Sequence, residues 1–417
     1  MTTSTPSRAG APSPGAPRPA TGSLRHGVGF WAVAAAFLVA MAFSTVPTPL
    51  YPLYEVRDGF STFMVTVVFA VYSVGVMVSL VLAGHVSDWV GRRKILVAAL
   101  ALELVAAALF LSSAALPMLL VARFVTGLGV GMLTATATAH LHELHAAHRP
   151  DASAQRFEVV STAANIGGLG LGPLVAGFLA QYVGTPLRVP YAVFVALLVL
   201  VVAALALAPE TVRPPARRPR YRPQRVSADH GDRAGYLAAA AAAFASFAVF
   251  GLFTSIAAGF VGHTLGHPSR ALAGGIVFAV FGGAALAQTL TQRLTPRAKM
   301  TAGLLAEGTG FLVLVVGMHT VNLAAFLAGG VVAGVGAGLL FKAAVGRVVA
   351  MAAPARRSEA LASLFLIAYL GLSVPAVAIG VATLSLTATT AMTWFAGLLL
   401  ALLCLVAVLD RRSPAGR

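Results

Sequence analysis

The chain has 417 residues, of which 58% are hydrophobic and only 10% are charged, and its formal net charge is +16. A soluble globular protein needs a mostly polar surface, so this composition excludes a water-soluble fold and predicts an integral membrane protein. The basic excess does not indicate nucleic-acid binding, because the Lys and Arg residues gather in connections between apolar runs. The single cysteine, Cys404, excludes an internal disulfide.

The apolar runs are long enough to cross a membrane. Residues 1–28 come first, rich in Pro, Ala, Ser and Thr, and they predict a disordered tail without the apolar core of a signal peptide. Crossing about 30 Å of hydrocarbon takes roughly 20 apolar residues. Twelve such runs follow, centred near residues 41, 75, 105, 128, 170, 199, 248, 281, 310, 333, 373 and 399. The sequence therefore predicts an all-α, polytopic fold with twelve transmembrane helices.

The basic residues indicate the orientation of these helices. Of the 29 Lys and Arg residues, 24 lie in the two tails and in the even-numbered connections, which share one side of the membrane. The other side has only Arg57, Arg188 and Arg270, while Arg123 and Lys342 fall inside apolar runs. Because basic residues concentrate on the cytoplasmic side, we expect both termini in the cytoplasm and the protein in the cell inner (plasma) membrane.

The chain divides into two similar halves. "VVFAVYSVGVM" (67–77) is echoed by "IVFAVFGGAAL" (276–286), and "TGLGVGML" (126–133) is echoed by "AGVGAGLL" (333–340). Parallel repeats that hold a substrate between them are typical of one large transporter class. The predicted units are a tail (1–28), a six-helix bundle (29–208), a basic cytoplasmic linker (209–235), a second six-helix bundle (236–410) and a C-tail (411–417).

A charged segment, "GHVSDWVGRRK", interrupts the apolar sequence at residues 84–94. It resembles the signature of the major facilitator superfamily between the second and third helices. The matching residues are Gly84, Asp88, Gly91, Arg92, Arg93 and Lys94. The resemblance covers about residues 30–410 and implies two pseudo-symmetric six-helix bundles, transport by alternating access and a gating latch at this segment. The alternative is a plain basic anchor on the cytoplasmic side.

A second motif, "GGLGLGPLVAG" at residues 167–177, resembles the fifth-helix pattern of proton-driven exporters in this superfamily, the drug:proton antiporter branch. The matching residues are Gly168, Gly172, Pro173 and Gly177, whereas Ala176 replaces one of the usual glycines. Small residues let helices approach closely, so generic helix packing explains the same pattern.

Three charged residues inside apolar runs are candidates for proton coupling. Arg123 begins "RFVTGLGVG", which resembles the superfamily's fourth-helix motif, although a snorkelling arginine would look similar. Glu103 and Glu307 are the only acids deep in the runs, and each follows an arginine by ten residues. Burial favours a protonated carboxyl that can exchange its proton when water reaches it. A carboxyl hydrogen-bonded to a neighbouring helix is the alternative.

Candidate substrate contacts follow from the resemblance, which implies a cavity formed by helices one, four, seven and ten. The candidates are Ser44, Thr45, Tyr51, Phe250, Phe253, Thr254 and Lys342. Such a cavity would be aromatic and mostly uncharged. Interfacial and core aromatics explain these rings equally well.

No nucleotide-binding loop or nucleophile and base constellation is present, so we expect no enzyme activity, no catalytic residues, no cofactor and no metal. We expect a monomer whose partners are a small-molecule substrate, protons and the lipid bilayer, with no nucleic acid. The predicted function is proton-coupled export of small hydrophobic compounds. A proton symporter that imports a sugar or other metabolite, and a non-transporting membrane receptor or scaffold, are the alternatives.

Overall fold

The computed structural model describes residues 20–212, 220–225, 232–353 and 356–413, and every element in these ranges is a helix. Most of the predicted tail, residues 1–28, lies outside the described residues, and its last part belongs to the first helix. The first half comprises α1 (Ala20–Ser44), η1 (Thr48–Leu50), α2 (Tyr51–Asp58), α3 (Thr62–Ala83), α4 (Ser87–Val90), α5 (Arg92–Ser112), α6 (Leu116–His148), α7 (Gln155–Thr162), η2 (Ala163–Gly167), α8 (Gly168–Tyr182), α9 (Val189–Ala204) and η3 (Leu205–Leu207). The second half comprises α10 (Arg233–Ser255), α11 (Ala257–Gly259), η4 (Phe260–Thr264), α12 (Arg270–Leu290), α13 (Pro296–His319), α14 (Leu323–Met351), α15 (Arg357–Ala382) and α16 (Ala388–Arg412).

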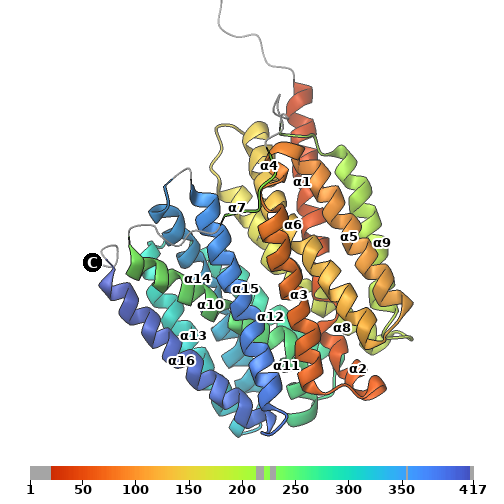
Figure 1. Cartoon of the computed structure of the whole chain (residues 1–417), viewed down its shortest axis with the longest axis vertical. Helices are drawn as coiled ribbons and strands as arrows, with labels where there is room; N and C mark the ends of the chain where they lie inside the picture. The colour runs from red at the N-terminus through yellow and green to blue at the C-terminus, as the bar shows by residue number, and fades with distance from the viewer. Residues whose placement is uncertain (1–19, 213–219, 226–231, 354–355, 414–417) are drawn as a thin grey trace, which may run out of the picture.

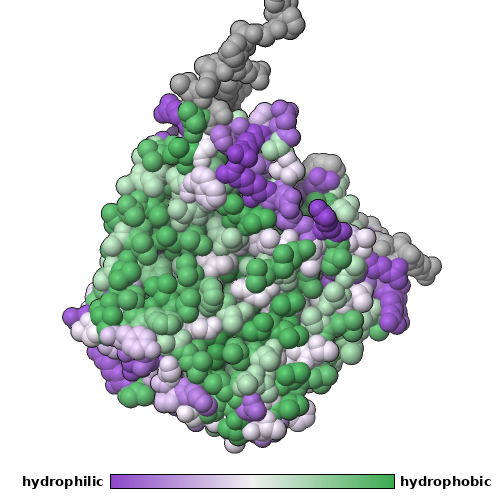
Figure 2. Space-filling model, turned by 180° about the vertical axis from the view of Figure 1, so that it is seen from behind, coloured by the Kyte–Doolittle hydropathy of each residue, from purple (hydrophilic) through white to green (hydrophobic). Residues whose placement is uncertain are grey.

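The predicted twelve spans are confirmed, because twelve helical stretches among the described residues are long and apolar enough to cross a membrane. Each predicted centre lies inside one of them. Three spans are composite: α1, η1 and α2 form one, α7, η2 and α8 form another, and α9 with η3 forms the third. Helices satisfy their backbone polar groups internally, which hydrocarbon demands. Apolar residues cover most of the surface in Figure 2, and polar residues gather at its ends.

Polar side chains mark where several helices begin. The capping side chains accept a hydrogen bond from a backbone N–H in the first turn, and they are Ser61, Asp232, Ser269, Thr295, Asn322 and Thr387. Such caps satisfy N–H groups that have no partner within the helix. At the start of α10, the Ser413 hydroxyl and the Gly235 N–H both donate to Asp232 and hold the pKa of that carboxyl below its usual value.

Both described chain ends lie on the same face as the linker between the halves. The end of α16 reaches the start of α10, because the Ser413 hydroxyl donates to Asp232. The start of α1 lies against the beginning of the linker, where a Cβ added to Gly29 would come within 2.7 Å of Pro209 Cδ. An even number of spans requires this arrangement. We call this side of the molecule the terminal face, and the other side the opposite face (Figure 1).

The two halves repeat the same helix packing, which confirms the pseudo-symmetric bundles. In the first half, a Cβ on Gly131 of α6 would lie 2.8 Å from the Val76 carbonyl oxygen of α3. In the second half, a Cβ on Gly338 of α14 would lie 2.6 Å from the Ala284 carbonyl oxygen of α12. These glycines occupy matching positions in the "TGLGVGML" and "AGVGAGLL" segments. Small residues at matching positions therefore bring equivalent helix pairs into backbone contact.

The halves meet through α8 with α12 and through α3 with α15. Near the opposite face these contacts involve backbone atoms. A Cβ added to Gly274 of α12 would lie 2.8 Å from the Pro173 carbonyl carbon of α8, and the Arg270 guanidinium donates to the Ala180 carbonyl over 3.0 Å. A Cβ on Gly380 of α15 would meet Thr66 of α3. The opposite face is therefore tightly closed.

On the terminal face, long side chains join the halves. Lys342 Nζ of α14 lies 3.5 Å from Glu158 Oε2 of α7, and the same ammonium donates to the Gln288 carbonyl over 3.0 Å. Flexible charged side chains adapt to small shifts that a backbone contact cannot follow. In Figure 1 the helices of the two halves diverge toward this face.

Candidate transport site

Helix α6 holds Arg123 in the interior of the first half. The side chain is 2% exposed, and Nη1 donates to the Ser44 carbonyl oxygen at the end of α1 over 2.7 Å. Its guanidinium carbon lies 4.5 Å from the centroid of the Tyr72 ring on α3. Nε has no hydrogen-bond partner, and no carboxylate among the described residues forms an ion pair with this arginine. Arg123 is thus a buried cation held by a carbonyl dipole and an aromatic face.

Glu103 lies in the same half, on α5, and is completely buried. Its carboxylate faces Gly129 of α6, where a Cβ would lie 2.6 Å from Oε1, so glycine makes room for the acid. Neither carboxyl oxygen has a hydrogen-bond partner among the described residues. Arg123 is near enough for the two charges to interact, although the pair is beyond ion-pair distance.

Glu307 occupies the matching position in the second half. It is fully buried on α13 and faces Gly336 of α14, where a Cβ would lie 2.6 Å from its Cα atom. Its carboxyl oxygens also lack hydrogen-bond partners within the described part of the chain. It differs from Glu103 in having no charged side chain that acts on it there. The two acids are pseudo-equivalent in position but lie in different electrostatic surroundings.

A tyrosine pair connects Arg123 to the other half. Tyr72, whose ring faces the arginine, interacts through its side chain with Tyr369 of α15 across the boundary between the halves. The Tyr369 ring lies 5.4 Å from Phe247 of α10, and Phe247 lies 5.0 Å from Phe341 of α14. Sequence reasoning missed both tyrosines, because the repeated segment at residues 67–77 that contains Tyr72 indicated equivalent helices and no binding role.

These rings belong to an aromatic cluster at the centre of the second half. Its members are Phe247, Phe250, Phe281, Phe341, Phe365 and Tyr369, which come from α10, α12, α14 and α15. Phe250 and Phe281 are stacked with centroids 4.6 Å apart. The cluster is an apolar surface beside the polar surroundings of Arg123.

The predicted cavity residues of the first half have different surroundings. The hydroxyl of Ser44 donates to the Met41 carbonyl over 2.8 Å, and that of Thr45 donates to the Leu169 carbonyl over 2.9 Å. Both hydroxyls are therefore engaged by backbone. The hydroxyl of Tyr51 is buried without a partner among the described residues.

The predicted cavity residues of the second half lie on α10 and α14. Phe250 is in the aromatic cluster, while Phe253 is completely buried against Gly330 and Phe326 of α14. The Thr254 hydroxyl donates to the Phe250 carbonyl over 2.6 Å. Lys342 takes part in the ion pair at the terminal face. The substrate roles of all seven residues stay predictions.

Arg92 is the centre of the charged segment at residues 84–94, whose gating role stays a prediction. Its guanidinium forms an ion pair with Asp88 of α4, donates to Ser87 over 2.7 Å, and lies 3.0 Å from Glu143 Oε1 at the end of α6. Thr211 donates to the same Glu143 carboxylate. The motif is therefore tied to α6 and to the linker within its own half.

Glu210 accepts hydrogen bonds from backbone N–H groups at the start of α5. Its carboxylate accepts the backbone N–H of Arg92 over 2.8 Å and that of Arg93 over 3.1 Å. Gly91 precedes the helix with φ of 117°, and a Cβ there would lie 2.6 Å from Glu210 Oε2. Only glycine fits this position without strain. Gly84 ends α3, and the side chains of Arg93 and Lys94 are exposed.

The fifth-helix motif packs on two partners. A Cβ on Gly168 would lie 2.8 Å from the Leu38 carbonyl of α1, and one on Gly172 would lie 2.5 Å from the Thr45 hydroxyl oxygen. Farther along α8, Gly177 and Pro173 contact the start of α12 in the other half. The motif therefore joins α1 and α12 through one helix.

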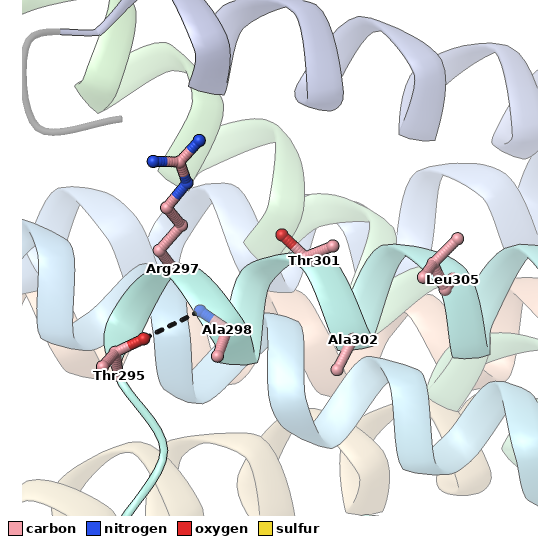
Figure 3. Close-up of a pocket in the computed structure, with 6 residues that line it drawn as sticks. All are labelled: Thr295, Arg297, Ala298, Thr301, Ala302 and Leu305. Atoms are coloured by element: carbon pink, nitrogen blue, oxygen red, sulfur yellow. Dashed lines mark hydrogen bonds between the residues drawn. The ribbon is translucent and has the colours of Figure 1, made fainter. Parts of the chain in front are cut away.

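Two surface grooves lie away from this central region. One, of about 490 Å³, is lined by a single helix, α13, through Thr295, Arg297, Ala298, Thr301, Ala302 and Leu305 (Figure 3). The other, of about 220 Å³, is formed by α1, the end of α6 and the start of α7. Neither is lined by residues from both halves.

Comparisons with known proteins agree with this architecture. The model of the Major Facilitator Superfamily matches residues 32–320. Uncharacterized MFS-type transporters Rv1877 and MT1926, from two strains of Mycobacterium tuberculosis, are each 29% identical over 197 residues, which is 47% of this chain and 28% of each relative. The crystal structure of the human organic anion transporter MFSD10 (TETRAN) superposes with a TM-score of 0.63 at 18% identity, covering 91% of this chain and 99% of that one. Because the family model spans more than half of a chain with twelve candidate spans, this multi-pass membrane protein belongs to the Major Facilitator Superfamily, a family of membrane transporters.

Proposed function

We propose that the protein is a proton-coupled exporter of small, largely apolar compounds that works by alternating access. The observation that carries this proposal is the buried carboxyl of Glu103, which has no hydrogen-bond partner among the described residues and lies near the buried cation Arg123. The orientation with the terminal face in the cytoplasm follows from the basic residues concentrated there. With the opposite face closed, we assign the structure to the state that would accept a compound from the cytoplasm.

The proton would bind to Glu103. An isolated carboxylate in an apolar interior is so costly that the group takes up a proton, whereas a nearby cation favours the charged form. Glu103 experiences both effects, so modest movement of Arg123 would change its proton affinity. Glu307 experiences only burial among the described residues, which makes it the better candidate for a permanently protonated, structural acid.

The compound would bind next to the aromatic cluster. Substrate pockets are mostly apolar, with a few polar groups that fix orientation. The Tyr72 and Tyr369 pair lies between the aromatic cluster and Arg123, so a compound held at these rings would lie close to the coupling group. The glycine contacts of α8 with α1 and α12 would transmit movement between the halves.

Flux into proteoliposomes tests this function. The purified protein is reconstituted, a pH gradient is imposed, and uptake of ethidium, a lipophilic cationic dye, is followed by fluorescence. We expect Glu103→Gln to abolish gradient-driven uptake while preserving exchange of dye between the two sides, because exchange requires no net proton movement. Glu307→Gln is the matched control and should keep gradient-driven uptake.

Equal loss of both activities in Glu103→Gln would show a binding or folding role instead. Full gradient-driven uptake in this variant would exclude Glu103 as the coupling group. Loss of gradient-driven uptake only in Glu307→Gln would transfer the role to the second half. Gradient-driven movement of a sugar in the inward direction would support the import alternative.

Organic anions are a second candidate substrate class. Arg123 is a buried cation that has no carboxylate partner among the described residues, and such a group favours an anionic ligand. One solved structure with a similar fold is that of a human organic anion transporter. Preferred flux of the anionic dye fluorescein over ethidium, abolished by Arg123→Gln, would favour this class.

A further inference from the structure

The groove formed by α1, α6 and α7 is distinct from the proposed transport site. Its lining residues are Leu24, Gly27, Val28, Phe30, Trp31, His145, His148 and Arg156, all from the first half and all at the terminal face. Its volume of about 220 Å³ is below the roughly 300–1,000 Å³ typical of pockets for drug-sized ligands. The proposed transport function does not use it.

Arg156 gives the groove a cationic group that no described carboxylate pairs with. Arg156 is half-buried, forms no ion pair with a described carboxylate, and neither Asp nor Glu lines the groove. His148 also lines the groove, and its ring is 3.0 Å from the position of a Cβ on Gly27. The position therefore favours an anionic group.

Aromatic rings hold the guanidinium in place. Its central carbon lies 5.7 Å from the Phe30 ring centroid and 5.4 Å from that of Trp31. An arginine stacked on a ring keeps its N–H donors available in the plane of the guanidinium, the geometry that recognises phosphate oxygens. The two rings thus hold the Arg156 guanidinium in place, and no described carboxylate pairs with it.

The outer side of the groove is apolar and exposed. Leu24, Val28 and Trp31 recur on one side of α1 and are 65%, 52% and 53% exposed. They lie where α1 enters the apolar belt, and tryptophan is enriched at that depth, with its ring at the level of the headgroups. A ligand that contacted both the Arg156 guanidinium and this apolar side of α1 would need an anionic head and apolar chains.

We propose that this groove binds the phosphate headgroup of an anionic phospholipid, with Arg156 as the anchoring residue. The phosphate accepts hydrogen bonds from the guanidinium, and the acyl chains run along the exposed side of α1 toward the membrane interior. A free phosphate ion has the same headgroup chemistry, but it would leave the apolar side of the groove uncovered.

Quenching of Trp31 fluorescence by brominated lipids tests the proposal on the full-length protein. The chain has three tryptophans, so Trp89→Phe and Trp394→Phe leave Trp31 as the reporter. The protein is reconstituted with phospholipids brominated on the acyl chains, either phosphatidylglycerol or phosphatidylcholine. We expect phosphatidylglycerol to bind at this position about fivefold more strongly, as one basic residue near the surface supplies.

Arg156→Gln should remove this preference, whereas Arg156→Lys should retain most of it. Arg149→Gln is the matched control, because Arg149 is an exposed arginine on the same face that does not line the groove. Loss of the preference only in Arg156→Gln supports a specific site. Equal loss in both Gln variants would mean a general effect of surface charge and would overturn the proposal.

Two further outcomes would also overturn it. One is equal quenching by the two lipids in the unaltered groove, which decides the matter even if Arg156→Gln does not fold. The other is complete displacement of phosphatidylglycerol by millimolar inorganic phosphate, which would identify a site for the free ion. Quenching that persists in phosphate supports the lipid site.

Discussion

The contact between α8 and α12 predicts how one added methyl group would shift the balance between the two states of the proposed transport cycle. Gly274 and Gly275 are neighbours on α12, yet only Gly274 faces the other half. A Cβ on Gly274 would lie 2.8 Å from the Pro173 carbonyl carbon and even closer to its oxygen, whereas a Cβ on Gly275 meets nothing within 4 Å. Gly274→Ala therefore perturbs the closed opposite face, and Gly275→Ala is its matched control.

The size of the effect follows from this geometry. Ordinary contact begins at 3.4 Å, so the two carbon atoms must separate by about 0.6 Å. One is a backbone atom and the other is bonded directly to the backbone, so the helices themselves must shift. Overpacking of this kind costs about 1–3 kcal/mol. If the opposite face opens in the other state, the cost falls on the closed state only. The equilibrium then shifts toward the open state by about 5- to 150-fold.

A cysteine at position 66 reports the opening. Thr66 is fully buried in the other contact of the opposite face, beside Gly380. In a Cys404→Ser background, Thr66→Cys should react slowly with a water-soluble maleimide, at a rate proportional to the open population. We expect Gly274→Ala to raise the labelling rate of Thr66→Cys by about 5- to 150-fold. Gly275→Ala gains helix propensity in both states and should leave the rate unchanged.

Equal labelling rates in the two alanine variants would refute the reasoning, because the predicted difference depends only on which glycine faces α8. A faster rate in both would indicate general loosening of α12. Elution of each variant as a single species in detergent separates this case from unfolding.

Three further predictions concern the terminal face. Gly91→Ala should lower the thermal unfolding midpoint in detergent more than Gly266→Ala, because both backbones have positive φ but only the Cβ at position 91 would meet Glu210. Glu210→Gln should destabilise the fold by about 0.5–2 kcal/mol through a weaker cap on α5, visible in the same melting assay. Lys342→Gln and Glu158→Gln should each raise maleimide access at the terminal face by less than about fivefold, since a partly exposed ion pair contributes about 0.2–1 kcal/mol. The double variant should show the same access as either single variant, because each substitution alone already breaks the pair. Additive effects of those two variants would show that the residues act separately.

Most of the fold could be predicted from the sequence, because hydrocarbon allows few solutions. A run of some 20 apolar residues in a membrane must form a helix, and the repeated "GxGxG" segments indicated equivalent helices in the two halves. The structure confirms both inferences through the glycine contacts of α6 and α14. The composition of a span, however, does not show which neighbour it contacts.

The surroundings of the candidate site were harder to predict. The gating motif was recognised from residues 84–94, but Glu143 and Glu210 lie 51 and 118 residues along the chain from Arg92, and only folding brings them together. Arg123 binds a backbone carbonyl of Ser44, and carbonyl groups are identical at every position of a sequence. Similarly, the hydroxyls of Ser44 and Thr45 looked available from composition, whereas helix geometry directs them to nearby carbonyls.

The alternate glycines of α6 have a mechanical consequence. Gly127 and Gly131 bring α6 against α3, whereas Gly129 brings it against α5, so that three helices touch through their backbones at one depth. The matching glycines of α14 do the same with α12 and α13. Closely packed backbones rearrange in discrete steps and do not bend smoothly. We therefore expect the helix backbones of each half to move largely as one rigid body, with the larger backbone displacements at the contacts between the halves.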